Sequence, residues 1–314
     1  MSKVIVFGSL NADLSIECDR IPRASETIQG RKFFITPGGK GGNQAVAAAR
    51  MGAETLMLGC VGPDAFGRDL VSSLVRFGVS CENVSVSRHY PTGTAIIMRS
   101  DNDKRIIINQ GANLRMNFDT VRTTLRGLAS KGDVFLTQLE CDFDTTIESV
   151  IFAHGMGLVT VMNASPAAEL PDELYAALDI LCINEAECEE LCGINPTEDP
   201  ASMRRALDFF AERGVGHTII TLGSKGSATL VDDQVHTVPS FDVTVEDTTG
   251  AGDAYLGALV TEFAAERPLE EAMIVASAAG ALATTKPGAQ KAMPGYHEVI
   301  DFLSENGEEI TWND

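Results

Sequence analysis

The sequence predicts a three-layer α/β sandwich, with a mostly parallel central sheet covered by helices on both faces and a small second β-sheet serving as a lid. Strand-like apolar segments alternate with helical segments over most of the 314 residues, and such alternation favours a parallel sheet. Gly-rich turns follow several of the expected strands. Two stretches, at about 14–36 and 94–109, show strand patterns without helices and predict the lid.

The first half of the chain opens with the apolar run Val4 to Phe7, which predicts a buried strand. The next residues, 8–13, have the composition of a polar turn at a strand end. A Gly-rich loop at 37–43 then leads into an Ala-rich helix. The expected elements from there are helix 44–51, strand 56–60, helix 66–77, strands 94–99 and 104–109 around a turn at 101–103, helix 118–128, strand 134–136, helix 143–153 and strand 158–162.

The second half keeps the same alternation and ends in helices. The expected elements are strand 180–183, helices 185–192 and 200–213, strand 218–222, two antiparallel strands at 226–231 and 234–238, and helices 251–265, 269–285 and 296–304.

We interpret residues 1–314 as one domain, with the segments at about 14–36 and 94–109 as two insertions that together build the lid over the site. A small sheet of this kind has exposed strand edges and apolar faces. The sequence therefore predicts a homodimer that pairs lid to lid.

The charge balance restricts the partners. The 44 acidic and 24 basic residues give a net charge of −20, whereas duplex nucleic acid and anionic membranes are bound by clustered Lys and Arg. We expect no nucleic-acid and no membrane partner.

The apolar run at the N-terminus is too short for a signal peptide or a membrane span. The seven cysteines lack C-x-x-C spacing. We therefore expect a cytoplasmic protein with reduced thiols.

The segment Asp247-Thr248-Thr249-Gly250-Ala251-Gly252-Asp253 is the strongest candidate for chemistry. Its glycines allow backbone N–H groups to converge at the start of a helix, where the helix dipole favours an anion. Asp253 stands beside them as a carboxylate able to accept a hydroxyl proton. Taken alone, an Asp at a helix start is also a common cap.

The usual nucleotide-binding motifs are absent from the sequence. There is no G-x-x-x-x-G-K-[ST], and the turn after the first strand lacks the second Gly of G-x-G-x-x-G. Segment 247–253 therefore remains the best candidate for binding a phosphoryl group.

Six motifs together resemble the ribokinase/PfkB family of carbohydrate kinases, in the order that the family shows them. They are Gly8-Ser9-Leu10-Asn11-Ala12-Asp13, Gly38-Gly39-Lys40-Gly41-Gly42-Asn43-Gln44-Ala45-Val46-Ala47, Gln138-Leu139-Glu140, Asn184-Glu185-Ala186-Glu187, Thr221-Leu222-Gly223-Ser224-Lys225-Gly226 and segment 247–253. The resemblance covers essentially the whole chain. It implies transfer of the ATP γ-phosphate to the primary hydroxyl of a sugar, with Asp253 as the base and Gly250, Ala251 and Gly252 stabilising the developing charge.

The resemblance also implies a sugar site. Its residues would be Asn11, Asp13, Gly39, Lys40, Asn43, Glu140 and Asp253. Asn11 together with Asp13 favours D-ribose, which would give D-ribose 5-phosphate. Other pfkB-family substrates (2-deoxyribose, another pentose, a ketohexose or a nucleoside) are the alternatives, and a non-catalytic sugar sensor is a third interpretation that the intact Asp253 disfavours.

For ATP, the resemblance implies contacts with Asn184, Thr221, Gly223, Ser224, Gly226, Gly252 and Ser277. Glu187 would lie near Mg²⁺, largely through water, since Mg²⁺ keeps several waters in proteins. A monovalent cation, K⁺ by expectation, would bind at Asp247, Thr249, Ala283, Lys286 and Gly288, mostly through backbone carbonyls. Ala292 departs from the Ser that family members often have there.

Overall fold

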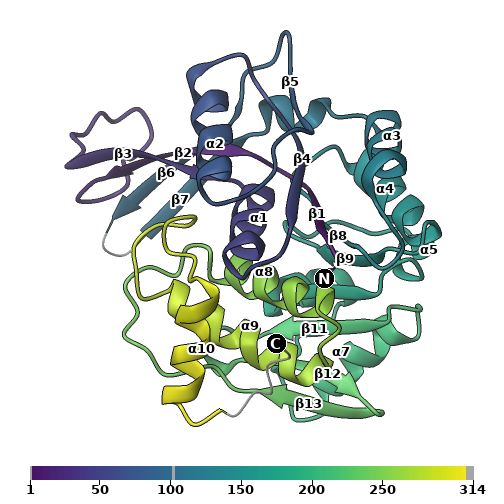
Figure 1. Ribbon diagram of the computed structural model, residues 1–314. Helices are drawn as coiled ribbons and strands as arrows, with labels where there is room; N and C mark the ends of the chain where they lie inside the picture. Colours follow the sequence, from purple (N-terminus) through teal and green to yellow (C-terminus); the bar gives the residue numbers. More distant parts are fainter. Residues whose placement is uncertain (1, 101–102, 309–314) are drawn as a thin grey trace.

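The computed structural model describes residues 2–100 and 103–308, and it has the predicted layered architecture (Figure 1). A nine-stranded sheet in the order β13-β12-β11-β10-β9-β8-β1-β4-β5 lies between two layers of helices. Its strands are parallel from β11 to β5, and β12 and β13 add an antiparallel edge. The predicted fold class is confirmed.

The strands of the central sheet are β1 (Val4–Phe7), β4 (Thr55–Val61), β5 (Val84–Val86), β8 (Val134–Gln138), β9 (Val159–Asn163), β10 (Ile180–Asn184), β11 (His217–Thr221), β12 (Ser227–Val231) and β13 (Gln234–Val238). The helices are α1 (Lys40–Arg50), α2 (Ala65–Arg76), α3 (Phe118–Leu128), α4 (Phe143–Gly155), α5 (Asp172–Tyr175), α6 (Glu185–Cys192), α7 (Ser202–Ala211), α8 (Ala251–Ala264), α9 (Leu269–Ala283) and α10 (Tyr296–Glu305), with short 3₁₀ turns at Gly111–Arg115 and Gly223–Lys225.

The core divides into two apolar clusters, one on each face of the sheet. Along β1, Val4 and Val6 join the cluster beneath α1, α2, α8, α9 and α10, whereas Ile5 and Phe7 join the cluster beneath α3 to α7. This division follows from the two-residue period of a strand, which points successive side chains to opposite faces. It explains why β1 is apolar at every position, as a strand buried on both faces must be.

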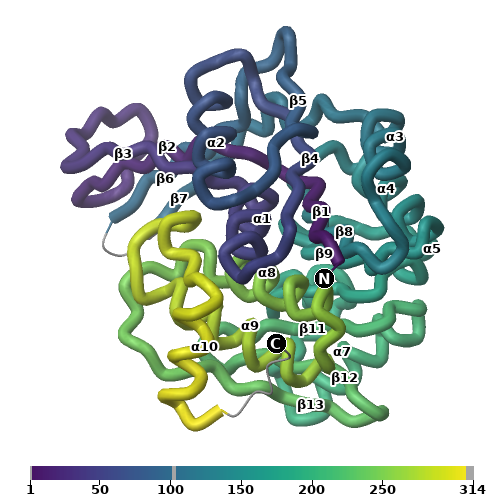
Figure 2. The backbone as a smooth tube through the Cα atoms, in the orientation of Figure 1, coloured from purple at the N-terminus to yellow at the C-terminus, as the bar shows by residue number. Residues whose placement is uncertain are grey.

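The lid sheet consists of β2 (Asn11–Glu17), β3 (Lys32–Gly38), β6 (Gly93–Ser100) and β7 (Asp103–Asn109), in the order β3-β2-β6-β7. The β2–β6 pair is parallel and the other two pairs are antiparallel. The sheet projects from the body beside the loops that precede α8 and α10 (Figure 2). Segments predicted from their strand-only pattern thus form a second sheet.

Several boundaries differ from the predictions. Residues 11–13, expected in a turn, already belong to β2, because they pair with residues 36–38 of β3 and residues 93–95 of β6. Helix α1 begins at Lys40 rather than at 44, and its glycines lie inside it. The reason is close packing: a Cβ on Gly41 would lie 2.5 Å from the carbonyl carbon of Gly8.

Two short elements escaped the sequence analysis. Strand β5 has three residues, and helix α5 has four, which is below the length at which hydrophobic periodicity becomes readable. Of the predicted turn between β6 and β7, residues 101–102 lie outside the described part. No helix within residues 2–100 and 103–308 is long and apolar enough to cross a membrane.

Candidate active site

The candidate site lies where the parallel strands end. The carboxyl ends of β1, β8, β10 and β11 lead directly to Ser9, Glu140, Asn184 and Thr221. In the sheet register Asn184 stands opposite Thr221. Residues from motifs that are far apart in sequence therefore meet at one edge, as expected for ligand sites in open parallel sheets.

Asp253 lies in the first turn of α8, and residues of α1 hold its carboxylate. Asn43 Nδ2 donates to Oδ2 at 2.9 Å, and Gln44 Nε2 donates to Oδ1 at 3.0 Å. Only 9% of Asp253 is exposed. Burial raises its pKa, and the Lys40 charge and these two hydrogen bonds act in the opposite direction. The carboxylate is therefore fixed in orientation and more basic than an exposed Asp.

Gln44 is a site residue that the sequence analysis missed. Its Nε2 also reaches Asn163 Oδ1 at 3.2 Å, and its Oε1 accepts from Gln138 Nε2 at 2.6 Å. Gln44 thus connects Asp253 to the ends of β8 and β9. The second motif contains Gln44, but its burial and its partners are seen in the structure and not in the sequence.

The start of α8 has the open N–H groups expected of an anion site. Gly250 has φ of +84°, a left-handed conformation that favours glycine. The backbone N–H groups of Gly252 and Asp253 have no acceptor among the described residues. A Cβ on Gly252 would meet nothing within 4 Å. Gly252 is therefore not required by packing, and the space beside it is available to a ligand.

On the sugar side, Glu140 joins two predicted motifs. Its Oε2 accepts from Ser9 Oγ at 2.5 Å and from the backbone N–H of Lys40 at 3.2 Å. Gly39 sits between them with φ of +86°, and a Cβ there would lie 2.7 Å from the Asn11 nitrogen. The structure therefore brings Asn11, Gly39, Lys40 and Glu140 together as predicted.

Asn11 and Asp13 point from the lid strand β2 toward this region, with different environments. Asn11 is buried, and its Oδ1 accepts from Asn113 Nδ2 at 2.8 Å. Asp13 makes no hydrogen bond to the described residues through its carboxylate. Burial, with the nearby Glu140 and Asp253 charges, raises the pKa of Asp13 to about 7. The Oδ1 of Asn43 is also buried without a partner within the described part.

Two cavities meet at segment 247–253. The smaller, of about 250 Å³, lies between the lid and the body, and Asp13, Asp247 and Thr249 line it. The larger, of about 550 Å³, is lined by Thr248, Ala251 and Gly252 from the same segment. The segment therefore forms the wall between the two cavities.

The larger cavity contains most of the predicted nucleotide-binding residues. Thr221, Gly223, Ser224, Gly226, Gly252 and Ser277 all line it, together with apolar residues such as Phe241 and Val243. The Ser277 hydroxyl donates to the Pro239 carbonyl at 2.9 Å. Asn184 is exposed next to Thr221 at the end of β10, and it does not line the cavity.

Asn184 and Glu187 form a capping box at the start of α6. Asn184 Oδ1 accepts from the Glu187 N–H, and Glu187 Oε2 accepts from the Asn184 N–H, both at 2.9 Å. The three-residue spacing thus has a structural reason. Within the described residues no cluster of three or more His, Cys, Asp or Glu could hold a metal ion.

The predicted cation residues lie on the loop before α8 and on the end of α9 with the loop that follows it. Gly288 N–H donates to Asp247 Oδ2 at 3.2 Å, and Thr249 donates to Asp247 Oδ1 through its N–H and hydroxyl. Burial by itself raises the pKa of Asp247, but these hydrogen bonds outweigh it and the pKa is lowered. The Lys286 ammonium points to Glu298 instead, and Ala283 is buried at the end of α9.

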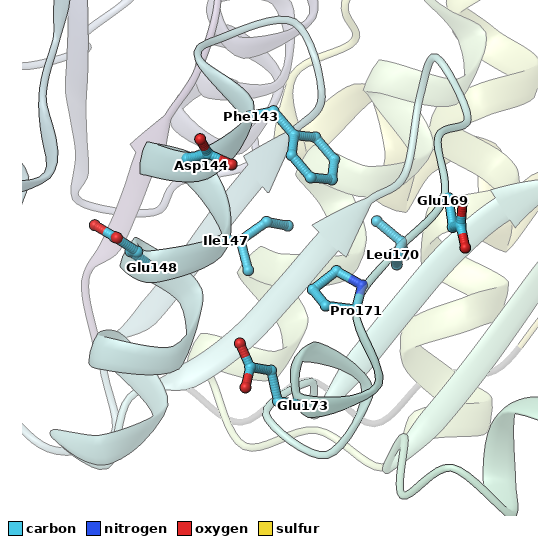
Figure 3. Close-up of a pocket in the computed structure, with 8 residues that line it drawn as sticks. All are labelled: Phe143, Asp144, Ile147, Glu148, Glu169, Leu170, Pro171 and Glu173. Carbon is cyan, nitrogen blue, oxygen red and sulfur yellow. The ribbon is translucent and has the colours of Figure 1, made fainter.

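A separate hollow of about 530 Å³ lies between α4 and the segment leading into α5. Figure 3 shows Phe143, Ile147, Leu170 and Pro171 around its apolar floor, with the carboxylates of Asp144, Glu148, Glu169 and Glu173 at the rim. None of the predicted site residues lines it. With 44 acidic residues in the chain, an acidic rim is ordinary surface.

Comparison with known proteins identifies the family. The sequence profile of the pfkB family of carbohydrate kinases matches residues 1–295. The chain belongs to this family. Ribokinase of Haemophilus influenzae is 33% identical over 299 residues, covering 95% of this chain and 97% of that protein. Deoxyribokinase of Salmonella typhi is 31% identical over 305 residues, covering 96% and 99%.

Solved structures agree with this pfkB-family membership. The structure of Arabidopsis thaliana ribokinase complexed with ribose and ATP is similar, with a TM-score of 0.87 and 30% identity over 96% of this chain and 98% of that one. The fold expected from the resemblance is confirmed.

Proposed function

We propose that this protein is an ATP-dependent kinase that phosphorylates the 5-hydroxyl of D-ribose, with residues 1–314 working as one domain. The observation that carries the proposal is the position of segment 247–253. It separates the cavity under the lid from the cavity lined by the predicted nucleotide residues, with Asp253 buried at its end. A phosphoryl group passing between the two cavities would travel along this segment.

In the proposed reaction, the Asp253 carboxylate accepts the proton of the sugar O5 hydroxyl. The O5 atom attacks the γ-phosphorus, the bond to the β,γ-bridging oxygen breaks, and ADP leaves. The free N–H groups of Gly252 and Asp253, presented by the Gly250-Ala251-Gly252 turn, stabilise the charge that develops on the phosphoryl oxygens. Asn43 and Gln44 keep the carboxylate aimed at the sugar.

The sugar assignment rests on polar groups at or near the smaller cavity, and of the proposed sugar residues Asp13 is the one that lines it. The Asp13 carboxylate has no hydrogen-bond partner among the described residues, so a sugar hydroxyl can donate to it. Asn43 Oδ1 also lacks a partner there, but this atom is buried. Asn11, Gly39, Lys40 and Glu140 complete the proposed site. Ribose is favoured because the similar Arabidopsis thaliana structure is complexed with ribose and ATP. 2-Deoxyribose, another pentose, a ketohexose and a nucleoside are the alternatives.

For the nucleotide, we propose that ATP occupies the larger cavity against Thr221, Gly223, Ser224, Gly226 and Ser277. Mg²⁺ would be held mainly by the phosphates and water, with Asn184 and Glu187 near it, because Mg²⁺ keeps several waters in proteins. When bound, it would neutralise phosphate charge. Asp247, Thr249, Ala283, Lys286 and Gly288 would hold K⁺, mostly through carbonyl oxygens.

We also propose a homodimer that pairs through the lid, in the cytoplasm. Seven of the large apolar residues that are exposed in the described chain lie on the lid strands: Phe33, Phe34, Ile35, Ile96, Ile106, Ile107 and Ile108. A concentration of this kind is typical of an interaction surface. A monomer by light scattering at working concentration would contradict this part of the proposal.

The deciding experiment is ADP release from ATP and Mg²⁺ over a sugar panel, with and without K⁺. We expect ribose to have the highest kcat/KM. A different sugar in first place would refute the ribose assignment while keeping the kinase. Tight sugar binding without ADP release from any sugar would identify a sensor instead.

A further inference from the structure

Arg99 connects the lid to the body of the protein. It lies near the end of β6, and its Nη1 atom is 3.4 Å from Asp247 Oδ2 while its Nη2 donates to Thr249 Oγ1 at 3.3 Å. Other lid ion pairs, such as those of Arg20 with Glu26 and of Lys32 with Glu17, stay within the lid. The Arg99 pair instead crosses the smaller cavity, which Arg99 lines opposite Asp247.

Asp247, the partner of Arg99, is held in place by other hydrogen bonds. Asp247 already accepts hydrogen bonds from the N–H groups of Thr249 and Gly288, so its carboxylate has one orientation. The Arg99 side chain is 28% exposed and that of Asp247 is 17% exposed, so water and salt screen this pair less than a surface pair. The Nε atom of Arg99 is buried without a partner within the described part.

The lid around Arg99 favours contact with the body. In the register of the lid sheet Arg99 stands opposite Glu17 on β2 and opposite Lys104 on β7. Arg99 and Lys104 are neighbouring cations and repel each other. Burial and the Arg99 charge lower the pKa of Lys104, whereas the Asp247 and Asp13 charges act in the opposite direction. Moving the lid away from Asp247 would remove one of the carboxylates that compensate this repulsion and would leave only those of the lid itself among the residues named here.

Both ends of this contact belong to the proposed chemistry. Asp13 lies on the same face of β2 as Glu17, and Glu17 stands opposite Arg99. Because β2 pairs with β6, the position of β6 sets the position of Asp13 over the sugar. Asp247 begins the segment that ends at Asp253. We propose that Arg99 is a positioning residue, which holds the lid against segment 247–253 and so places Asp13 over the sugar. The inference rests on the proposed kinase function.

The first test is kinetic. Relative to wild type, we expect Arg99→Ala to raise the KM for the sugar about tenfold, equivalent to about 1.4 kcal/mol, with a smaller change in kcat and the KM for ATP. R99M keeps most of the volume without the charge and should resemble R99A. R99K restores the charge without the forked geometry and should recover part of the affinity.

The matched control is R20A. It also removes one positive charge from a lid ion pair, that of Arg20 with Glu26, but this pair does not reach the body. We expect its sugar KM to stay within about twofold of wild type. Equal effects of R99A and R20A would show that net lid charge is responsible and would overturn the proposal.

The second test does not depend on activity. Amide hydrogen exchange without ligands should become faster in β2, β6 and residues 246–250 of R99A and R99M, and remain unchanged in R20A. Unchanged exchange in R99A overturns the positioning role whether or not the protein phosphorylates ribose. Failure of wild type to release ADP with any sugar, together with faster exchange in R99A, would refute the kinase and keep the contact between lid and body.

Discussion

Gly252 offers a test that separates binding of a phosphoryl group from stability. It is the second residue of α8, and a Cβ there would project into the larger cavity without touching any protein atom within 4 Å. Replacing an interior helical Gly by Ala stabilises a protein by up to about 1 kcal/mol. In a chain of this size that raises Tm by about 2 °C. Gly252→Ala should therefore fold at least as well as wild type.

Its activity should nevertheless fall. The new methyl group would stand beside the free N–H groups of Gly252 and Asp253, in the space that the proposed reaction gives to the phosphoryl oxygens. The methyl group would keep a phosphoryl oxygen from reaching these N–H groups, and removing one donor from an oxyanion site costs about 10²–10³-fold in rate. We therefore expect kcat/KM for ATP to fall by about 100-fold, measured by coupled ADP release, while urea unfolding shows unchanged or increased stability.

Gly257→Ala is the matched control in the same helix. A Cβ on Gly257 would lie 2.2 Å from the Ala47 Cβ, at the contact between α8 and α1. Overpacking of this kind costs about 1–3 kcal/mol, so G257A should lose stability in urea unfolding, opposite to the result expected for G252A. If G252A retained kcat/KM for ATP within about threefold of wild type, the assignment of this turn to the phosphoryl group would be wrong.

Three further predictions concern single carboxylates. D253N should lower kcat by about 10²–10⁴-fold, the range for a lost general base, while ribose binding persists in calorimetry; a kcat near that of wild type would exclude Asp253 as the base. Folding raises the pKa of Asp13 from 3.8 to about 7. As the pH rises between these two values and Asp13 ionises, the folded protein loses at most about 4 kcal/mol of stability. D13N should then be more stable than wild type at pH 8 in urea unfolding, and equal stability at both ends of the window would refute the shift. E187Q preserves the capping box, because Gln can accept the Asn184 N–H, so stability should stay constant while the Mg²⁺ concentration for half-maximal rate increases; an unchanged requirement would leave Glu187 a purely structural role.

The fold was predictable because its strongest signals are local. The four apolar residues of β1 and the helical periods between strands depend only on neighbouring residues. The start of α1 was not predictable in this way, because Gly41 and Gly42 are poor helix formers in isolation. The packing around the start of α1 requires glycine at both positions: a Cβ on Gly42 would meet Leu10 and Gln290, and a Cβ on Gly41 would meet the backbone of Gly8. That contact joins segments more than thirty residues apart, which no sequence window contains.

The same distinction applies to the site. Asp253 and its glycines form one local motif, so their role could be inferred from the sequence. Gln44 and Arg99 could not be found, because each acts on a residue more than a hundred positions away. Gln44 adjoins a predicted residue, but nothing local distinguishes it from an ordinary buried amide. Arg99 lies in a lid strand, and the residues around it predict only an amphipathic strand.

The spacing of Asn184 and Glu187 predicts a helix cap, but it does not by itself predict a ligand. Its spacing is fully explained by a capping box, which many helices have without any ligand. What distinguishes this box is its place, since β10 ends at Asn184 directly opposite Thr221, at the border of the larger cavity. The capping box fixes the end of β10. The register of the sheet then places Asn184 at the border of the larger cavity. The local physics of the helix and the position in the sheet are therefore separate requirements, and only their combination points to a nucleotide.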